Sequence, residues 1–162
     1  MITDNEGLLR TLTGGRVDFI LIGGVAAIMH GSARLTLDLD VVYARNRNNI
    51  ERVVAALRPL NPYPRGAPDG LPFTWDSDTV TSGLNFTLKT ALGDFDLLGE
   101  ASGDGTYEML LPRSMQIDAF GISFRCVTLE TLILLKRAAG RPKDFEAIAE
   151  LEALREEIRR RR

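Results

Sequence analysis

Two aspartates separated by a single residue, Asp38 and Asp40, are the strongest chemical feature of the sequence. Residues i and i+2 of a strand point to the same side, so both carboxylates are expected to project from one face. Two negative charges held this close repel, and the pKa of one should rise unless a cation lies between them. Mg²⁺ prefers oxygen ligands and is commonly bound by one or two carboxylates together with substrate phosphates. The pair therefore predicts a site for Mg²⁺, or for Mn²⁺.

The residues around this pair indicate a strand over Leu35–Tyr43 that is buried on one side. Its alternation places Leu37, Leu39 and Val41 on one face and the two aspartates on the other. A solvated strand face is the alternative interpretation. Unpaired carboxylates are costly in a buried strand, and this favours a functional role.

A second strand, predicted within the segment Gly93–Leu98, supplies Asp94 and Asp96. If this strand lies beside the first, one of its carboxylates would reach the same metal ions. A two-metal site needs such a third ligand, because one ion holds the phosphates and the other activates the attacking hydroxyl. Asp94 is interpreted as a turn residue, and Asp96, deeper in the strand, is the preferred ligand.

The diglycine Gly23–Gly24 separates a buried strand, predicted over Val17–Ile22, from a short helix predicted over Val25–Met29. Glycine lets a phosphate approach the backbone closely, and a helix start offers free N–H groups to an anion. Taken alone, a diglycine is more often only a tight turn.

Three further polar residues have positions compatible with phosphate binding. Lys136 follows Leu132 by four positions and Leu129 by seven, and therefore lies on the apolar stripe of a predicted helix. Its ammonium either reaches water from a stem packed on the core or faces phosphates in a cleft, and the spacing alone favours neither. Arg34 and Thr36 flank the carboxylate strand; Arg34 either stabilises the end of the sheet or binds phosphate.

The elements that must position these residues predict an α/β (α+β) fold, in which helices cover a mixed sheet and a helical pair follows it. We expect a single domain, 1–162, whose sheet core 1–127 carries the carboxylates and whose C-terminal helices occupy 128–162. Helices are predicted at 4–13, 25–29, about 46–57, 128–139 and from 142 onward. Strands are predicted at 17–22, 35–43, 84–90, 95–98, 115–117 and 122–127, and a proline-rich loop at 59–72.

Composition excludes several classes of function. The 162 residues include 44% hydrophobic and 26% charged residues, as in an ordinary globular protein. A net charge of −2 gives no global basic field for nucleic acid; the final run Arg159–Arg162 is either a solvated terminus or an RNA-facing tail. One cysteine and one histidine exclude an internal disulfide and argue against structural zinc. No signal peptide or membrane span is recognisable, so we expect a cytoplasmic protein with no membrane partner.

Together these motifs resemble the catalytic signature of the DNA polymerase β-like nucleotidyltransferase superfamily: a diglycine turn, an Asp-x-Asp strand and a later third carboxylate. The fuller run from Gly23 through His30–Gly31, Arg34 and Thr36 to Asp40 is similar to the bacterial nucleotidyltransferases allied to AbiEii toxins. Two late segments extend this similarity, Val127–Lys136 and Gly140–Asp144.

The resemblance implies an Mg²⁺-dependent enzyme that moves a nucleoside monophosphate from a nucleoside triphosphate to RNA, such as a tRNA end, or to a protein. It also implies a toxin–antitoxin component with a cognate antitoxin as partner. Its metal-binding and catalytic residues would be Asp38, Asp40 and Asp96. Its nucleotide-binding residues would be Gly23, Gly24, Arg34, Thr36, Lys136, Arg141, Lys143 and Asp144.

Two other interpretations stay open. A non-catalytic nucleotide-binding or partner-binding module of the same fold would keep the architecture without turnover. A metal-dependent phosphodiesterase would use the same carboxylates, but such sites usually recruit histidines, and His30 is the only one in the chain.

Overall fold

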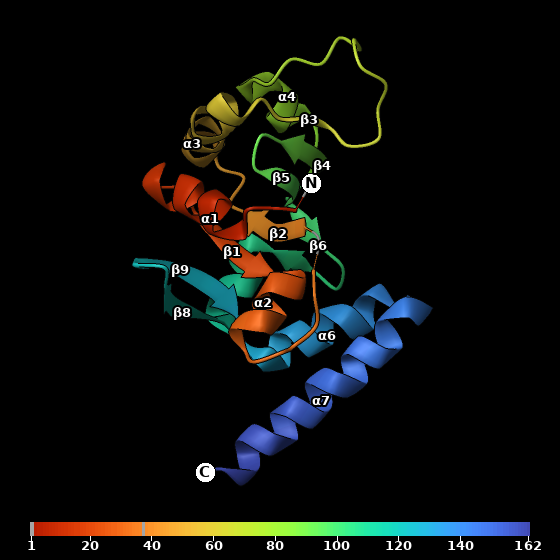
Figure 1. Cartoon of the computed structure of the whole chain (residues 1–162). Coiled ribbons are helices and arrows are strands. Elements are labelled where there is room, and N and C mark those ends of the chain that lie inside the picture. The colour runs from red at the N-terminus through yellow and green to blue at the C-terminus, as the bar shows by residue number, and fades with distance from the viewer. Residues whose placement is uncertain (1, 37) are drawn as a thin grey trace.

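Seven strands form one mixed sheet in the computed structural model, which describes residues 2–36 and 38–162 (Figure 1). The strand order is β3-β4-β5-β2-β1-β9-β8. Neighbours pair antiparallel except β1 with β9 and β2 with β5, which are parallel. The strands are β1 Phe19–Ile22, β2 Asp38–Tyr43, β3 Tyr63–Pro64, β4 Asn85–Thr90, β5 Gly93–Leu98, β8 Ser114–Ala119 and β9 Ile122–Val127. The predicted α/β class with a mixed sheet is confirmed.

Short polar side chains start several of the helices, as their sequences predict. Asn46 accepts a hydrogen bond from the backbone of Asn49, and Thr128 accepts one from Thr131, so α3 and α6 are capped as expected. Gly140 ends α6 in the left-handed conformation. The helices are α1 Asn5–Gly14, α2 Gly23–Met29, α3 Arg47–Leu57, α4 Ser77–Ser82, α5 Tyr107–Leu110, α6 Leu129–Ala139 and α7 Phe145–Arg160.

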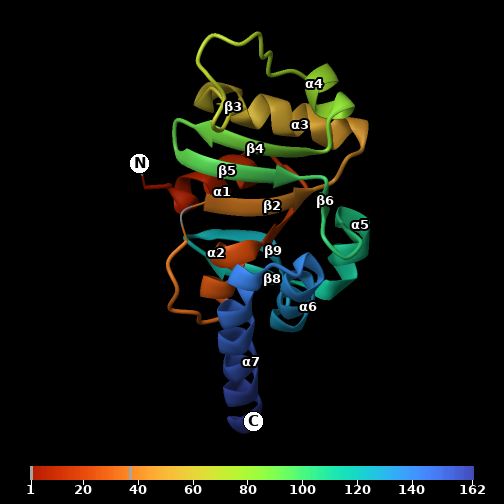
Figure 2. The ribbon, with the colours of Figure 1, turned by 90° about the vertical axis from the view of Figure 1, so that its right-hand side faces the viewer.

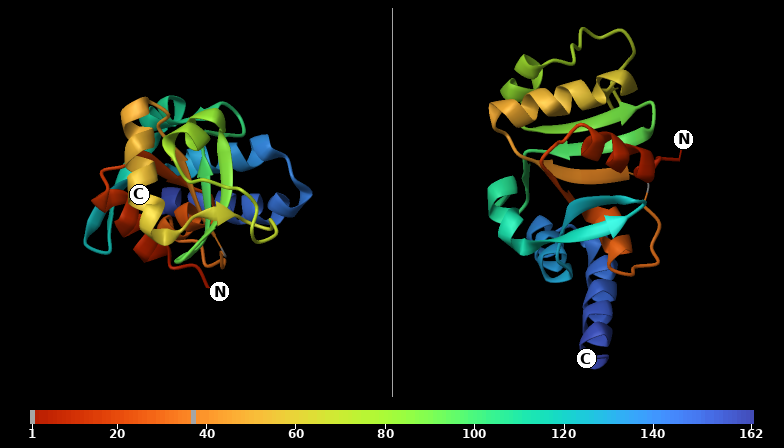
Figure 3. Two further views of the ribbon diagram at one scale, coloured as in Figure 1. Left: turned by 90° about the horizontal axis from the view of Figure 1, so that it is seen from above. Right: turned by 90° about the vertical axis from the view of Figure 1, so that its left-hand side faces the viewer.

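Helices lie on both sides of the sheet. α1 and α3 cover one face, and α2, α6 and α7 lie together towards the opposite side (Figures 1 and 3). α7 packs beside α6, and its C-terminal end projects away from the sheet (Figure 2). The central strand β2 is anchored by Leu39, Val41 and Val42, none of which is exposed to solvent. The strand that carries Asp38 and Asp40 is therefore anchored in the core of the molecule.

The structure differs from the sequence-based expectations at several element boundaries. β2 begins at Asp38 rather than Leu35, whose side chain is 97% exposed; Leu37 lies outside the described residues. Helix α2 begins at Gly23 itself, because the diglycine forms its first turn. The proline-rich loop holds a 3₁₀ turn, Arg58–Leu60, and the short edge strand β3.

No strand was predicted in the segment between β5 and β8 before residue 115. It contains a small separate pair of strands, β6 Glu100–Ala101 and β7 Gly105–Thr106. Two further 3₁₀ turns, Leu111–Arg113 and Pro142–Asp144, precede β8 and α7. Among the described residues, none of the helices combines the length and apolar character required to cross a bilayer.

Candidate active site

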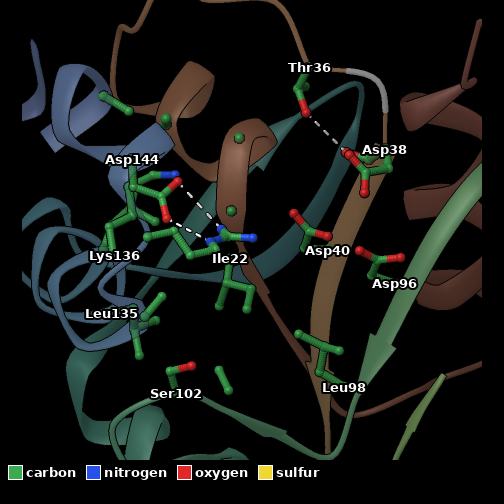
Figure 4. Close-up of a pocket in the computed structure, with 18 of the residues that line it drawn as sticks. Ile22, Thr36, Asp38, Asp40, Asp96, Leu98, Ser102, Leu135, Lys136 and Asp144 are labelled. Carbon is green, nitrogen blue, oxygen red and sulfur yellow. Dashed lines mark hydrogen bonds and ion pairs between the residues drawn. The ribbon is translucent and has the colours of Figure 1, made fainter. Parts of the chain in front are cut away.

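Three carboxylates meet on one face of the two central parallel strands. Register pairs Asp38 with Asp94 and Asp40 with Asp96, because β2 and β5 run side by side in the same direction. Oxygen atoms of Asp38, Asp40 and Asp96 all lie within 4.8 Å of one another, and the three side chains point towards a common space (Figure 4). The strand adjacency on which the prediction of Asp96 depended is thus confirmed.

The electrostatics of this cluster, called here the acidic triad, are those of crowded like charges. The pKa of Asp40 rises to about 8, first because burial removes water, then through a hydrogen bond with Asp96 and the negative charges of Asp38 and Asp96. Burial also raises the pKa of Asp38, with Asp96 adding to the rise. A hard divalent cation would relieve this repulsion, and the all-oxygen donor set fits Mg²⁺ or Mn²⁺.

The diglycine packs closely against Asp40 of the triad and against Thr36. Gly23 has a φ of +72°, and a β-carbon built on it would lie 2.1 Å from Oδ2 of Asp40. A β-carbon on Gly24 would lie 2.6 Å from Oγ1 of Thr36, which also donates to the carbonyl of Asp38 at 3.2 Å. Both glycines are therefore required by close packing of α2 against Asp40 and Thr36, whether or not a phosphate binds there.

A cavity of about 690 Å³ opens beside the triad. It brings together every residue that the sequence predicted for the site. These are Gly23, Gly24, Arg34, Thr36, Asp38, Asp40, Asp96, Lys136, Arg141, Lys143 and Asp144. The triad forms one wall, while α6, the turn after it and α7 form the opposite wall (Figure 4). Negative and positive side chains thus face each other across the cavity.

The wall opposite the triad carries Lys136, Arg141 and Lys143 and is called here the cationic wall. On it, Asp144 holds the side chain of Arg141 in place. Its Nε donates to Oδ2 of Asp144 at 2.7 Å, and Asp144 itself is only 6% exposed. The buried carboxylate fixes the direction of a guanidinium that remains half exposed at the cavity. Lys136 lies in the last turn of α6, and its positive charge acts to lower the pKa of Asp40.

Arg34 forms ion pairs with α7 rather than with the triad. Its Nη1 lies 3.4 Å from Oε2 of Glu150, and its Nη2 lies 4.0 Å from Oε2 of Glu146, both on α7. Ser32 also donates to Glu150, at 2.7 Å. The segment before β2 is thus fastened to α7, a contact that neither of the two roles considered for Arg34 anticipated. The lone His30 contacts the carbonyl of Val127 at 2.8 Å and ties the end of α2 to β9.

Arg65 is the site residue that sequence reasoning missed. Its guanidinium forms ion pairs with Asp38, Asp94 and Asp96. One signal in the sequence could have drawn attention to it: it is the only basic residue between Asn61 and Pro72. Nothing in that segment, however, predicts that a short edge strand would aim this side chain across β4 towards β5.

Comparisons with known proteins were made by sequence and by structure. No protein-family profile matches the sequence, and no curated protein matches it significantly. The lincosamide antibiotic adenylyltransferase LnuA, solved with lincomycin bound, is similar in structure, with a TM-score of 0.61 and 16% identity over 94% of this chain and 98% of its own.

Two other solved structures are similar. One is a protein of Thermotoga maritima assigned as a nucleotidyltransferase, with a TM-score of 0.54 and 14% identity, covering 93% of this chain and 94% of its own. The other is an antigenic nucleotidyltransferase-like protein of Paracoccidioides brasiliensis, with a TM-score of 0.56 and 12% identity over 94% of this chain and 77% of its own. The chain therefore has the nucleotidyltransferase fold.

Proposed function

We propose that the protein is a metal-dependent nucleotidyltransferase, which transfers a nucleoside monophosphate from a nucleoside triphosphate to a hydroxyl group. The observation that carries this proposal is the acidic triad facing a cationic wall across one cavity. Carboxylates at one side would hold divalent cations, and the ammonium and guanidinium groups opposite would hold phosphates. The fold shared with nucleotidyltransferases supports the same assignment.

In the proposed reaction, the acceptor oxygen forms a bond to the α-phosphorus, and the bond from that phosphorus to the bridging oxygen of pyrophosphate breaks. A bound divalent cation supplies Lewis-acid stabilisation of the phosphate charge. Asp38, Asp40 and Asp96 would hold it, and Asp96 would also accept the proton that the acceptor hydroxyl loses. Lys136, Arg141 and Lys143 would bind the triphosphate, with Asp144 keeping Arg141 aimed at the cavity.

Three classes of acceptor carry the hydroxyl group that this reaction needs: RNA, proteins and small molecules. The resemblance to the nucleotidyltransferases allied to AbiEii toxins implies RNA or a protein, together with a toxin role and an antitoxin partner. The lincomycin-bound neighbour adds a small hydroxylated molecule as another class. A net charge of −2 gives no global basic field for nucleic acid, which supports a protein or small-molecule acceptor over RNA.

The decisive experiment measures transfer of an α-³²P-labelled nucleotide to a tRNA pool, a cell-protein fraction and a panel of lincosamide antibiotics. The wild type is expected to label one of these acceptors in Mg²⁺, and the double variant Asp38→Asn with Asp40→Asn to label none. Equal labelling by a folded double variant would sink the proposal.

The non-catalytic alternative has its own outcome. Calorimetry that finds a tight protein partner but no Mg²⁺-dependent nucleotide binding would favour a partner-binding module of this fold. Nucleotide binding that requires Mg²⁺ and vanishes in the double variant would favour the enzyme.

A further inference from the structure

Arg65 places one positive charge inside the acidic cluster. Its Nη1 lies 3.7 Å from Oδ2 of Asp38, and its Nε lies 3.6 Å from Oδ1 of Asp94. Its Nη2 donates to Oδ1 of Asp96 in the closest of the three contacts. Side-chain exposures of 28% for Arg65 and 22% for Asp96 show that this contact is partly withdrawn from water. The pairing is therefore stronger than an ordinary surface ion pair.

The sheet holds this arginine in place. The backbone N–H of Arg65 donates to the carbonyl of Thr87 at 2.9 Å, which continues the pairing of β3 with β4. Its Nη2 also donates to the carbonyl of Leu88 at 3.2 Å. The guanidinium thus crosses over β4 to reach β5 and β2, and its position follows from main-chain pairing at the sheet edge.

The guanidinium contacts two of the three carboxylates that a metal ion would need. Asp38 and Asp96 belong to the acidic triad, and each carries a contact to Arg65. Within the described part of the chain, no ion pair joins Arg65 to Asp40, the third member. A divalent cation bound by the triad would share two ligands with the guanidinium and would be repelled by its charge.

We propose that Arg65 is an internal counter-cation that competes with divalent metal for Asp38 and Asp96, and so sets the metal concentration at which the site assembles. The inference rests on the proposed metal-dependent transfer and assigns its regulation to this residue. Asp94 and the Leu88 carbonyl remain as partners for the guanidinium when metal displaces it. The long arginine side chain can make this move while β3 stays paired.

A purely structural role for Arg65 predicts the opposite result. If the arginine only held Asp96 in position, its removal would loosen the triad and weaken metal binding. If it competes with the metal, its removal frees two ligands and strengthens metal binding. The sign of the change in affinity distinguishes the two roles.

The test is calorimetric titration of the full chain with Mn²⁺, without nucleotide. We expect Arg65→Met to bind Mn²⁺ about tenfold more tightly than wild type, because a nearby positive charge is lost. Arg65→Lys keeps the positive charge but not the planar guanidinium with its several donors. Its Mn²⁺ affinity should lie between those of wild type and Arg65→Met. Arg52→Met is the matched control, since Arg52 on α3 pairs with Asp18 at 3.4 Å, away from the triad, and should leave Mn²⁺ affinity unchanged.

Thermal unfolding provides a second readout and a check of folding. In EDTA, Arg65→Met should melt below wild type because the carboxylates have lost their counter-charge, and Mn²⁺ should raise its melting temperature by more than it raises that of wild type. Unchanged or weaker Mn²⁺ binding by Arg65→Met would overturn the inference.

Failure of the inference is distinguishable from failure of the proposed function. If Asp40→Asn loses Mn²⁺ binding while Arg65→Met matches wild type, only the role of Arg65 is refuted. If neither wild type nor Arg65→Met binds Mn²⁺, the metal-dependent function falls as well.

Discussion

Gly23 and Asp40 are fitted against each other so closely that even one added carbon on the glycine would overlap the carboxylate. The distance from that carbon to Oδ2 would be 2.1 Å. The first turn of α2 and the carboxylate-bearing face of β2 are consequently one packed unit. Movement of either should disturb the other.

Substitution of this glycine should therefore cost more than backbone strain alone. Gly66 provides the matched control, since its φ of +80° is similar and nothing lies within 4 Å of its added β-carbon. We expect Gly66→Ala to lose about 1 kcal/mol of unfolding free energy and Gly23→Ala about 3 kcal/mol or more. Urea denaturation measures both, and equal losses would show that the contact with Asp40 carries no cost.

The raised pKa of Asp40 predicts how stability depends on pH without metal. A carboxyl whose pKa is about 8 in the folded state and ordinary in the unfolded state binds more protons when folded between those values. The contribution of Asp40 to the free energy of unfolding should therefore be highest below about pH 4. It should fall as the pH rises to about 8.

Denaturation in EDTA across this pH range checks that slope. The raised pKa of Asp38 acts in the same direction. Asp40→Asn should flatten the decline, and saturating Mn²⁺ should do the same in the wild type. A metal-free stability that climbs over this range, with the slope unaltered in Asp40→Asn, would contradict the assignment.

Variants of Lys136 and of its neighbour Arg137 distinguish phosphate binding by one side chain from a general effect of positive charge on the helix. Lys136 lines the cavity, whereas Arg137 pairs with Glu152 on α7. We expect Lys136→Met to weaken binding of a nucleoside triphosphate about tenfold, and Arg137→Met to change it by less than about twofold. Calorimetry in Mg²⁺ with each nucleotide gives both values, and a larger loss in Arg137→Met would reverse the assignment.

Asp144 should act on the nucleotide through Arg141. Asp144→Asn keeps the shape but removes the buried charge that orients the guanidinium, so the KM for nucleotide should rise about fivefold while kcat changes little. Arg141→Met should produce a similar rise. If the two residues work as a pair, the double variant should be little worse than either single variant. Fully additive losses would show independent roles.

The acidic triad could be predicted because the sequence signals that indicate it are local. Alternation around Leu39 identifies the face of β2, and a buried strand makes its aspartates conspicuous. The capping of α6 by Thr128 and its stop at Gly140 are equally local, and they place Lys136 correctly on its helix. The assignment of Asp96 needed one further assumption, the adjacency of two strands, which the register of β2 and β5 confirms.

Arg65 and the anchoring of Arg34 lay beyond this reasoning because both depend on tertiary placement. The two-residue strand β3 is too short to produce an alternating pattern, yet it determines where Arg65 points. The partners of Arg34 lie more than 110 positions later, on α7. The strand start was misplaced at Leu35 because an apolar residue in sequence was taken as a buried one, and its side chain is almost fully exposed.

The order in which the charges occur along the chain has a consequence for synthesis on the ribosome. Asp38 and Asp40 emerge first, Arg65 next and then Asp96, whereas Lys136, Arg141 and Lys143 are made last. A nascent chain that pairs β2 with β5 before its final helices exist would already contain Arg65 to offset the crowded carboxylates. The same arginine that competes with metal in the finished protein would then allow the central strands to assemble during translation.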